Sequence, residues 1–266
     1  MKYPALSLCV FLLSTTVSPA ALIALFDFEE GSGATTTDAS GNSRVGTLGD
    51  GASWDTNVFA PGGSTASIFF DGTDNANVAV ASWKAPEIGD TNSRSIALWM
   101  RSADGVLPGA SNLGFIGYGE NQAGDKFNFR TQIDNGPIDG NIRVEVNGGY
   151  IIGTTVVVDG LWHHVAMTWE DDGTPDVLDV KLYVDGQLEE ISASLDEIMH
   201  TDTTNGIDFT IADDHSNREW HGWLDDIRVY DHALSGSDIA ALAVPEPSAS
   251  LLGLFGFSFL LLKRRR

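Results

Sequence analysis

The chain has 266 residues, 37 acidic against 15 basic side chains, a formal charge of −22 at pH 7 and one cysteine. Such a negative surface repels nucleic acid, anionic lipid and acidic polysaccharide, so it excludes DNA or RNA binding and favours divalent cations and neutral or basic partners. The length is sufficient for one large domain with its own hydrophobic core.

The first residues have the pattern of a secretory signal peptide. Lys2 precedes an apolar stretch over residues 5–17, and Ser18-Pro19-Ala20 supplies the small residues of a cleavage site. We expect a signal peptide over residues 1–20. Cys9 lies within it, so the exported chain would have no disulfide, no thiol nucleophile and no thiolate metal site.

Short runs of alternating apolar and polar residues follow, separated by Gly, Asn and Asp clusters, which predicts an all-β antiparallel sandwich. Ile142, Val144 and Val146, for example, alternate with Arg143 and Glu145. Over residues 178–184 the even positions are expected to form the buried face. We expect a short helix over residues 235–243, with Ser235 as N-cap and Asp238 completing a capping box. The predicted strands are 22–28, 66–70, 77–81, 95–101, 114–118, 127–133, 141–147, 153–158, 162–170, 178–184, 207–212 and 223–230.

Several motifs in this region occur in a characteristic order. They are Leu25-Phe26-Asp27-Phe28-Glu29, Phe70-Asp71-Gly72, Trp162-His163-His164-Val165, Leu182-Tyr183-Val184-Asp185-Gly186 and Trp223-Leu224-Asp225-Asp226-Ile227-Arg228-Val229-Tyr230. The set resembles a laminin-G-like, concanavalin A-like jelly roll of the bacterial kind. The resemblance implies one domain over residues 21–243, with two packed antiparallel sheets, a concave face and variable loops along one rim. Glycans or proteins are the ligands that it implies.

Carboxylates of the first and last strands are candidate metal ligands. Asp225 alternates with Ile227 and Val229, so we expect it to point inward, where a carboxylate needs hydrogen-bond donors or a cation. The resemblance implies a structural Ca²⁺ between these strands, with Asp27, Glu29, Asp225 and Asp226 as candidate ligands, because calcium prefers oxygen donors. The alternative is that backbone amides hydrogen-bond the Asp225 carboxylate.

Candidate ligand contacts lie near predicted turns and strand edges. Trp54, Trp83 and Trp220 could stack on the apolar face of a sugar ring. Asp71 and Asp74 could contact a ligand or calcium, although turn formation also accounts for them. Trp99 and Trp169 lie within strands, where core packing is expected.

No nucleophile-elbow, phosphate-loop or zinc-protease motif occurs in the chain, and no Glu-x-Asp-x-Glu triplet of the concanavalin-like glucanases is present. The sequence therefore predicts a non-catalytic module. Two alternatives stay open: a glycan-active hydrolase with unusual carboxylate placement, and a purely structural matrix component crosslinked by Ca²⁺.

The C-terminal residues 244–266 resemble a PEP-CTERM sorting signal. Pro245-Glu246-Pro247 precedes an uncharged segment over residues 248–262 and a basic end, Lys263 to Arg266. The resemblance implies recognition by an exosortase-type transpeptidase and transient insertion in the inner membrane, because 15 residues fall short of the roughly 20 that a stable span needs. The implied destination is the cell surface, outer membrane or extracellular matrix of a Gram-negative bacterium. The alternative is a plain membrane anchor.

Overall fold

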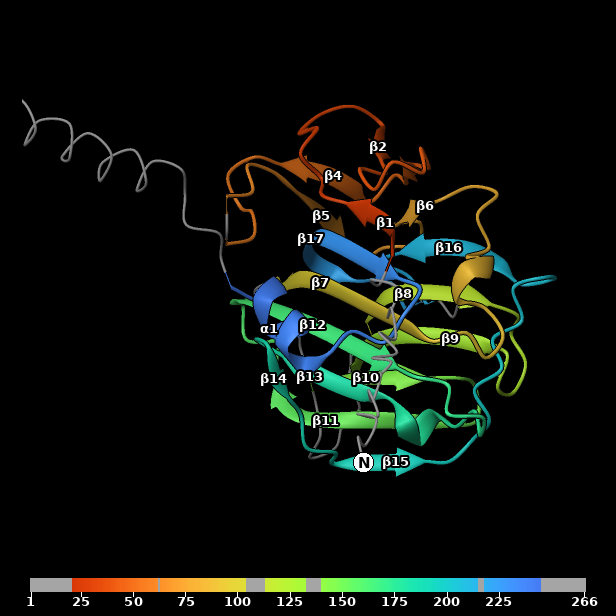
Figure 1. Ribbon diagram of the computed structural model, residues 1–266. Helices are drawn as coiled ribbons and strands as arrows, with labels where there is room; N and C mark the ends of the chain where they lie inside the picture. Colours follow the sequence, from red (N-terminus) through yellow and green to blue (C-terminus); the bar gives the residue numbers. More distant parts are fainter. Residues whose placement is uncertain (1–20, 62, 104–112, 133–139, 215–217, 245–266) are drawn as a thin grey trace, which may run out of the picture.

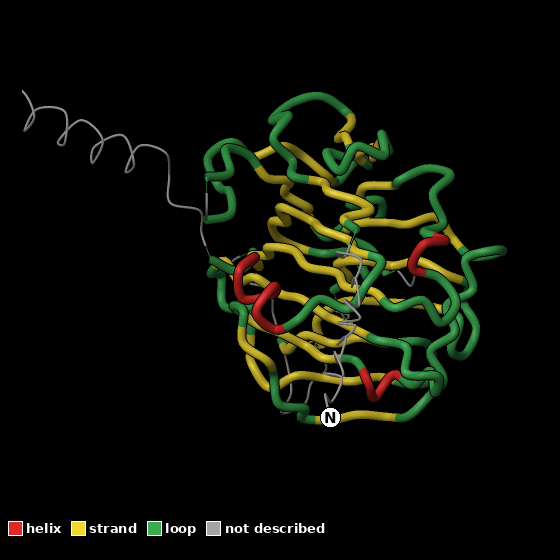
Figure 2. Tube along the Cα trace, viewed as in Figure 1, coloured by secondary structure: helices red, strands yellow, loops and turns green. Residues whose placement is uncertain are grey.

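Two antiparallel β-sheets pack face to face in a computed structural model, which describes residues 21–61, 63–103, 113–132, 140–214 and 218–244 (Figures 1 and 2). The all-β sandwich predicted from the alternating pattern is confirmed. Each predicted strand overlaps a strand of the structure.

Within the described residues, sheet A has eight strands and sheet B has nine. The order in sheet A is β14 (Gln187–Leu188), β13 (Lys181–Val184), β12 (Trp162–Trp169), β7 (Arg94–Ser102), β17 (His221–Tyr230), β5 (Ser67–Asp71) and β4 (Ala52–Asp55), and β1 (Leu22–Phe26) pairs with the end of β17. The order in sheet B is β15 (Ala193–Leu195), β11 (Tyr150–Val156), β10 (Asn141–Glu145), β9 (Lys126–Gln132), β8 (Gly114–Gly119), β16 (Ile207–Ile211), β6 (Val78–Ala79), β3 (Val45–Leu48) and β2 (Thr35–Thr37).

The core lies between the sheets because alternate residues of the central strands are apolar. Leu98 and Met100 of β7 contribute to it from sheet A, and Phe127 and Phe129 of β9 from sheet B. The buried positions predicted in β10 and just after it, Ile142, Val144 and Val146, are confirmed as core residues. Every second residue of these strands therefore points away from the core.

The prediction that the even-numbered residues over 178–184 are buried is confirmed only from residue 180 onward. Leu178 is exposed and lies in a 3-10 turn, η2 (Val177–Asp179), rather than in a strand. The carboxylate of Asp176 accepts a hydrogen bond of 2.6 Å from the Leu178 amide, which stabilises the turn. Val180, Leu182 and Val184 are buried as predicted. A second 3-10 turn, η1, spans Pro86–Ile88.

Helix α1 (Gly236–Leu242) covers part of the outer face of sheet A (Figure 1). The predicted capping box is confirmed, since the Ser235 side chain accepts from the Asp238 amide and the Asp238 side chain accepts from the Ser235 amide. Ile239 packs with Ala97, Ala166 and Tyr183 in a small apolar cluster beneath the helix. In the described ranges no helix is long and apolar enough to cross a membrane.

Candidate functional site

A β-bulge in β17 decides which way Asp225 points. Asp225 lies opposite Trp99 of β7 and Arg228 lies opposite Ala97, so two residues of β17 face one of β7. Asp226 has a positive φ of 48° at this bulge. The bulge places Asp225 beside Trp99 on the outer face of sheet A, whereas Ile227 belongs to the core. The prediction that these two residues share a face is wrong, because simple alternation fails across a bulge.

Asp225 is nevertheless fully buried, as expected for a carboxylate that needs partners. Its oxygens accept hydrogen bonds from the Ala60 amide (3.0 Å), the Ser64 hydroxyl (2.7 Å) and the Asp226 amide (2.8 Å). Burial raises the pKa of Asp225 to about 7, and these donors offset only part of that effect. The alternative in which backbone amides hydrogen-bond the carboxylate is confirmed.

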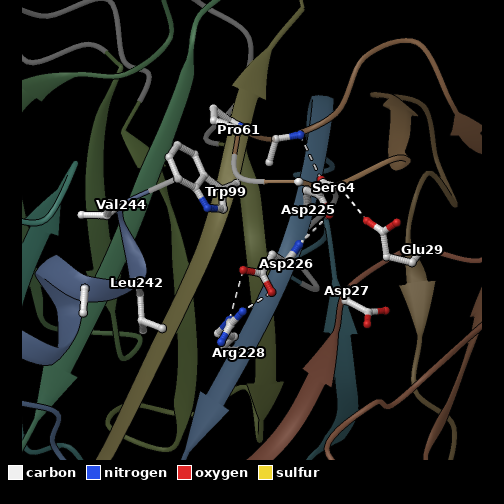
Figure 3. Close-up of a pocket in the computed structure, with 13 residues that line it drawn as sticks. Asp27, Glu29, Pro61, Ser64, Trp99, Asp225, Asp226, Arg228, Leu242 and Val244 are labelled. Atoms are coloured by element: carbon white, nitrogen blue, oxygen red, sulfur yellow. Dashed lines mark hydrogen bonds and ion pairs between the residues drawn. The ribbon is translucent and has the colours of Figure 1, made fainter. Parts of the chain in front are cut away.

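Around Asp225 lies a pocket of about 390 Å³, here called the acidic pocket (Figure 3). Asp27, Glu29, Asp225 and Asp226 all line it, so the structure brings together the four predicted metal ligands. Trp99 and the end of helix α1 form the opposite wall. The segment from Ala60 to Ser64 closes the pocket over Asp225.

Protein donors already engage three of these carboxylates. Glu29 accepts from the Thr65 amide (3.0 Å), and the Ser64 hydroxyl oxygen lies 2.8 Å from it. Asp226 forms an ion pair with Arg228 at 3.0 Å. The pKa of Asp27 is raised by its partial burial and by the nearby negative charges of Glu30 and Glu29.

These contacts do not fit a calcium ion. Among the described residues, no three His, Cys, Asp or Glu side chains are placed to hold one metal. Calcium needs six to eight oxygen ligands at 2.3–2.6 Å, but here hydroxyl, amide and guanidinium groups occupy oxygens that the ion would require. Calcium at Asp27, Glu29, Asp225 and Asp226 stays a prediction that would demand rearrangement of Ser64 and Arg228.

Two of the predicted sugar-stacking residues are core residues instead. Trp220 is fully buried and packs against Phe115 with ring centroids 4.9 Å apart. Trp83 is buried against Phe209, with centroids 4.6 Å apart, and its indole N–H donates to Glu87. Neither ring offers a face to a ligand, so the prediction is wrong for both. Both residues lie near predicted turns, and that position does not show that a residue far away in the sequence covers the ring.

Trp54, Asp71 and Asp74 lie nearer the surface. Trp54 is half-buried, packs edge-on against Phe28 and donates its indole N–H to the Gly33 carbonyl at 2.8 Å. Asp71 accepts from the amide and hydroxyl of Thr73, which lowers its pKa and accounts for it as a turn residue. Asp74 is exposed. Ligand contact by these three residues stays a prediction.

A second polar region lies on the outer face of sheet B. Phe127 and Phe129 of β9 point into the core, so Asn128 and Arg130 point outward. In the adjacent strand Arg143 lies directly opposite Arg130. We call this region the sheet B polar face and define it by the outward residues of three neighbouring strands: Lys126, Asn128, Arg130, Gln132, Asn141, Arg143, Glu145 and Tyr150.

Glu145 joins the two opposed guanidinium groups, because its carboxylate pairs with both Arg130 and Arg143. Burial opposes ionisation of Glu145, but the two arginines outweigh it and hold its pKa below the usual value. The Arg143 guanidinium also lies 4.0 Å from the centre of the Tyr150 ring.

Asp214 approaches Arg130 from the other side. The segment Asp213–Asp214 crosses β8 where Gly114 and Gly117 leave room, since a Cβ on either glycine would lie 2.6 or 2.8 Å from its backbone. Asp214 pairs with Arg218 at 3.1 Å, and the Nε atom of Arg130 lies 3.9 Å from it.

Several buried polar atoms of this face have no hydrogen-bond partner among the residues that the structure describes. Arg130 is 1% exposed, yet its Nε and Nη1 atoms have none. The same holds for Nε of Arg143 and Oδ1 of Asn141. Burial lowers the pKa of Arg130 to about 10, although Glu145 acts in the opposite sense. Buried polar atoms are normally paired, so these mark a functional candidate.

The alternation over residues 142–146 predicts only that Arg143 and Glu145 point outward. The alternation in Lys126-Phe127-Asn128-Phe129-Arg130 likewise predicts that Lys126, Asn128 and Arg130 point outward. Outward polar residues are ordinary in an antiparallel sheet, and only the register between strands shows that two arginines meet.

Comparison with known proteins shows which family the chain belongs to. A laminin G model described as the concanavalin A-like lectin/glucanases superfamily matches residues 70–240, well over half of the chain. The chain belongs to this superfamily. The laminin-G-like resemblance inferred from the motifs is therefore confirmed, and no curated protein matches the chain.

Solved structures of other proteins have a similar fold at low sequence identity. Domain 4 of AbnA, a GH43 extracellular arabinanase from Geobacillus stearothermophilus solved with arabinotriose, is 15% identical with a TM-score of 0.56, and the match covers 85% of this chain and 99% of that domain. The binding domain of Paraclostridial mosquitocidal protein 1 is 17% identical with a TM-score of 0.57, over 84% of this chain and 52% of that one.

A third relative is the ligand-binding domain of botulinum neurotoxin serotype D in complex with N-acetylneuraminic acid. It is 18% identical with a TM-score of 0.52, over 84% of this chain and 50% of that one. This superfamily member thus spans about half the length of the toxin domains that it matches. At these identities the likeness establishes the fold alone.

Proposed function

We propose that this protein is an exported, non-catalytic, cell-surface or extracellular-matrix protein whose laminin-G-like domain binds carbohydrate. The observation that carries the proposal is the sheet B polar face, where guanidinium, amide and carboxylate groups of adjacent strands lie close together and buried polar atoms lack partners. A few placed polar groups of this kind fix the orientation of a ligand.

Carbohydrate suits this face better than a protein partner. A sugar presents many hydroxyl groups, and each can donate to an amide oxygen such as that of Asn141 and accept from a guanidinium group such as that of Arg143. The ring of Tyr150 adds an apolar surface beside Arg143. Two members of the fold were solved with a sugar, arabinotriose in one and N-acetylneuraminic acid in the other. These complexes support the ligand class and leave the individual sugar open.

The non-catalytic assignment is supported by the state of the acidic pocket. A retaining glycoside hydrolase needs two accessible carboxyl groups about 5 Å apart, one with a raised pKa. Asp225 has the raised pKa, but it is fully buried and its oxygens accept hydrogen bonds from the protein itself.

The proposed destination follows from both ends of the chain, residues 1–20 and 244–266, which, apart from Val244, lie outside the described residues. Sec export, recognition of Pro245-Glu246-Pro247 by an exosortase-type transpeptidase and transient membrane insertion through residues 248–262 would deliver the domain to the cell surface. Mass spectrometry of the protein recovered from the producing cells tests this route. A chain that begins near Ala21 and ends near Pro247 is expected, and an uncut chain would contradict it.

A glycan array tests the binding function. The purified protein is applied with and without Ca²⁺, and selective binding to a subset of glycans is expected. An array without binding in either condition would contradict the proposal and favour a structural role. Hydrolysis of a glycan that one carboxylate substitution abolishes would overturn the non-catalytic assignment.

A further inference from the structure

Positive charge is concentrated on the outer face of sheet B, in a chain whose overall charge is strongly negative. Only ten Lys and Arg residues lie between Ala21 and Pro247. Four of them act on one another here: Lys126, Arg130, Arg143 and Arg218. Within the described residues, Glu145 and Asp214 act on this group, and a single carboxylate, Glu145, is shared by two of its guanidinium groups.

The opposition of Arg130 and Arg143 costs stability in the unliganded protein. Like charges directly across a strand pair are destabilising, and here a single carboxylate, Glu145, pairs with both. Nε and Nη1 of Arg130 and Nε of Arg143 are left without acceptors. Proteins tolerate such local conflicts mainly at functional sites, where a ligand resolves them.

The missing partner is an acceptor that can serve several donors at once, because Nε and Nη1 of Arg130 and Nε of Arg143 point in different directions. A carboxylate is acceptor-only and offers two oxygens with about four lone-pair sites. Around the two arginines, Asn128, Asn141 and the Tyr150 ring offer the neutral contacts that suit the remainder of a sugar. The charge of the whole chain opposes a polyanion, so acidic groups on the ligand should be widely spaced.

We infer that the sheet B polar face binds a sugar residue that carries a carboxylate, of the uronic or sialic acid type, within an otherwise neutral glycan. This inference rests on the proposed carbohydrate-binding function and names its ligand class. The sugar carboxylate lies against Arg143 and Arg130, and the sugar hydroxyls contact the neighbouring amide side chains.

Matched ligand pairs test this by isothermal titration of the full protein. Cellobiouronic acid is compared with cellobiose, and sialyllactose with lactose, so that the two sources of a carboxylate are separated. At least one acidic sugar should bind about tenfold or more tightly than its neutral partner. Equal affinities within both pairs, or no binding of either acid, would overturn the inference. Binding of neutral glycans alone would overturn it and leave the proposed function intact.

Substitutions of opposite expected effect separate recognition from folding. Arg143→Gln should weaken binding of the acidic sugar at least tenfold and change binding of its neutral partner less than about threefold. Glu145→Gln removes the internal competitor and should strengthen binding of the acidic sugar severalfold. Lys181→Gln, on sheet A, removes the same charge as Arg143→Gln and should change neither. Equal losses for acidic and neutral sugars, or weaker binding by both Arg143→Gln and Glu145→Gln with thermal unfolding unchanged, would contradict the inference.

Discussion

The hydroxyl of Ser64 donates a hydrogen bond of 2.7 Å to the carboxylate of Asp225, which lies 161 residues further along the chain. This bond and the one from the Ala60 amide hold the segment before β5 over the outer face of β17. The same Ser64 hydroxyl also lies 2.8 Å from Glu29. One serine therefore connects two walls of the acidic pocket and satisfies a buried carboxylate.

Removal of this hydroxyl should destabilise the fold. At pH 8, Ser64→Ala leaves part of a buried charge without a donor, so we expect the free energy of unfolding to fall by about 1–3 kcal/mol. Urea denaturation measures the change. Ser53→Ala, at an exposed position of β4, is the matched control and should change the value by less than about 0.5 kcal/mol. Equal effects of the two substitutions would show that Ser64 does not support Asp225.

Calcium provides a test of the acidic pocket. Because protein donors occupy the oxygens of Glu29, Asp225 and Asp226, we expect millimolar Ca²⁺ to leave the thermal unfolding temperature unchanged relative to EDTA. A calcium-dependent rise that is lost in Asp225→Ala and in Asp226→Asn would contradict this expectation. It would restore the structural calcium that the sequence predicts.

His164 should make stability fall in mild acid. It is 2% exposed, its ring packs edge-on against Trp99, and burial lowers its pKa to about 4, against the opposing effect of Asp185. The unfolded chain binds the proton near pH 6.5, so the stabilisation is complete above that pH and is lost as the pH falls toward 4. We expect a loss of about 2–3 kcal/mol over this interval.

Comparison of His164→Asn with the wild type isolates this effect. Asp225 has a raised pKa and acts in the opposite sense between about pH 4 and pH 7, but it is present in both proteins. Urea denaturation across this range should give a shallower acid loss for His164→Asn. Identical profiles for the two proteins would exclude His164 as the source.

Helix α1 should contribute to stability through one side chain. Ile239 is fully buried over Ala97 and Ala166, so Ile239→Ala should lower the free energy of unfolding by about 2–4 kcal/mol. Ser237→Ala, on the exposed side of the same helix, should have an effect below about 0.5 kcal/mol. A loss of similar size in both variants would show that burial of the Ile239 side chain is not the source.

The sequence predicts the central strands and the helix well because their patterns are local. Alternation over residues 141–147 and the capping box at Ser235 need no knowledge of distant residues. Three strands near the sheet edges, β2, β3 and β4, are not predicted, since Thr35–Thr37, Val45–Leu48 and Ala52–Asp55 lack an alternating apolar face. Their pairing with neighbours, rather than their own pattern, makes them strands.

The sites depend on register, which a single sequence does not contain. The bulge at Asp226 moves Asp225 to the other face of sheet A. The residue types at that position do not predict a bulge. The opposition of Arg130 and Arg143 likewise follows from strand pairing. The four carboxylates of the acidic pocket were grouped correctly because the first and last strands are neighbours. The hydrogen bonds that occupy them come from residues 60–65, which the sequence did not connect with the pocket.

The central claim is that the sheet B polar face is the ligand-binding face, and nuclear magnetic resonance tests it most directly. Amide chemical shifts of the labelled protein are recorded during titration with a glycan that binds on the array. The largest changes should fall in β9, β10 and β11, at residues 126–132, 141–145 and 150–156. Changes confined to the acidic pocket, at residues 27–29, 60–64 and 225–228, with none in these three strands, would contradict the account.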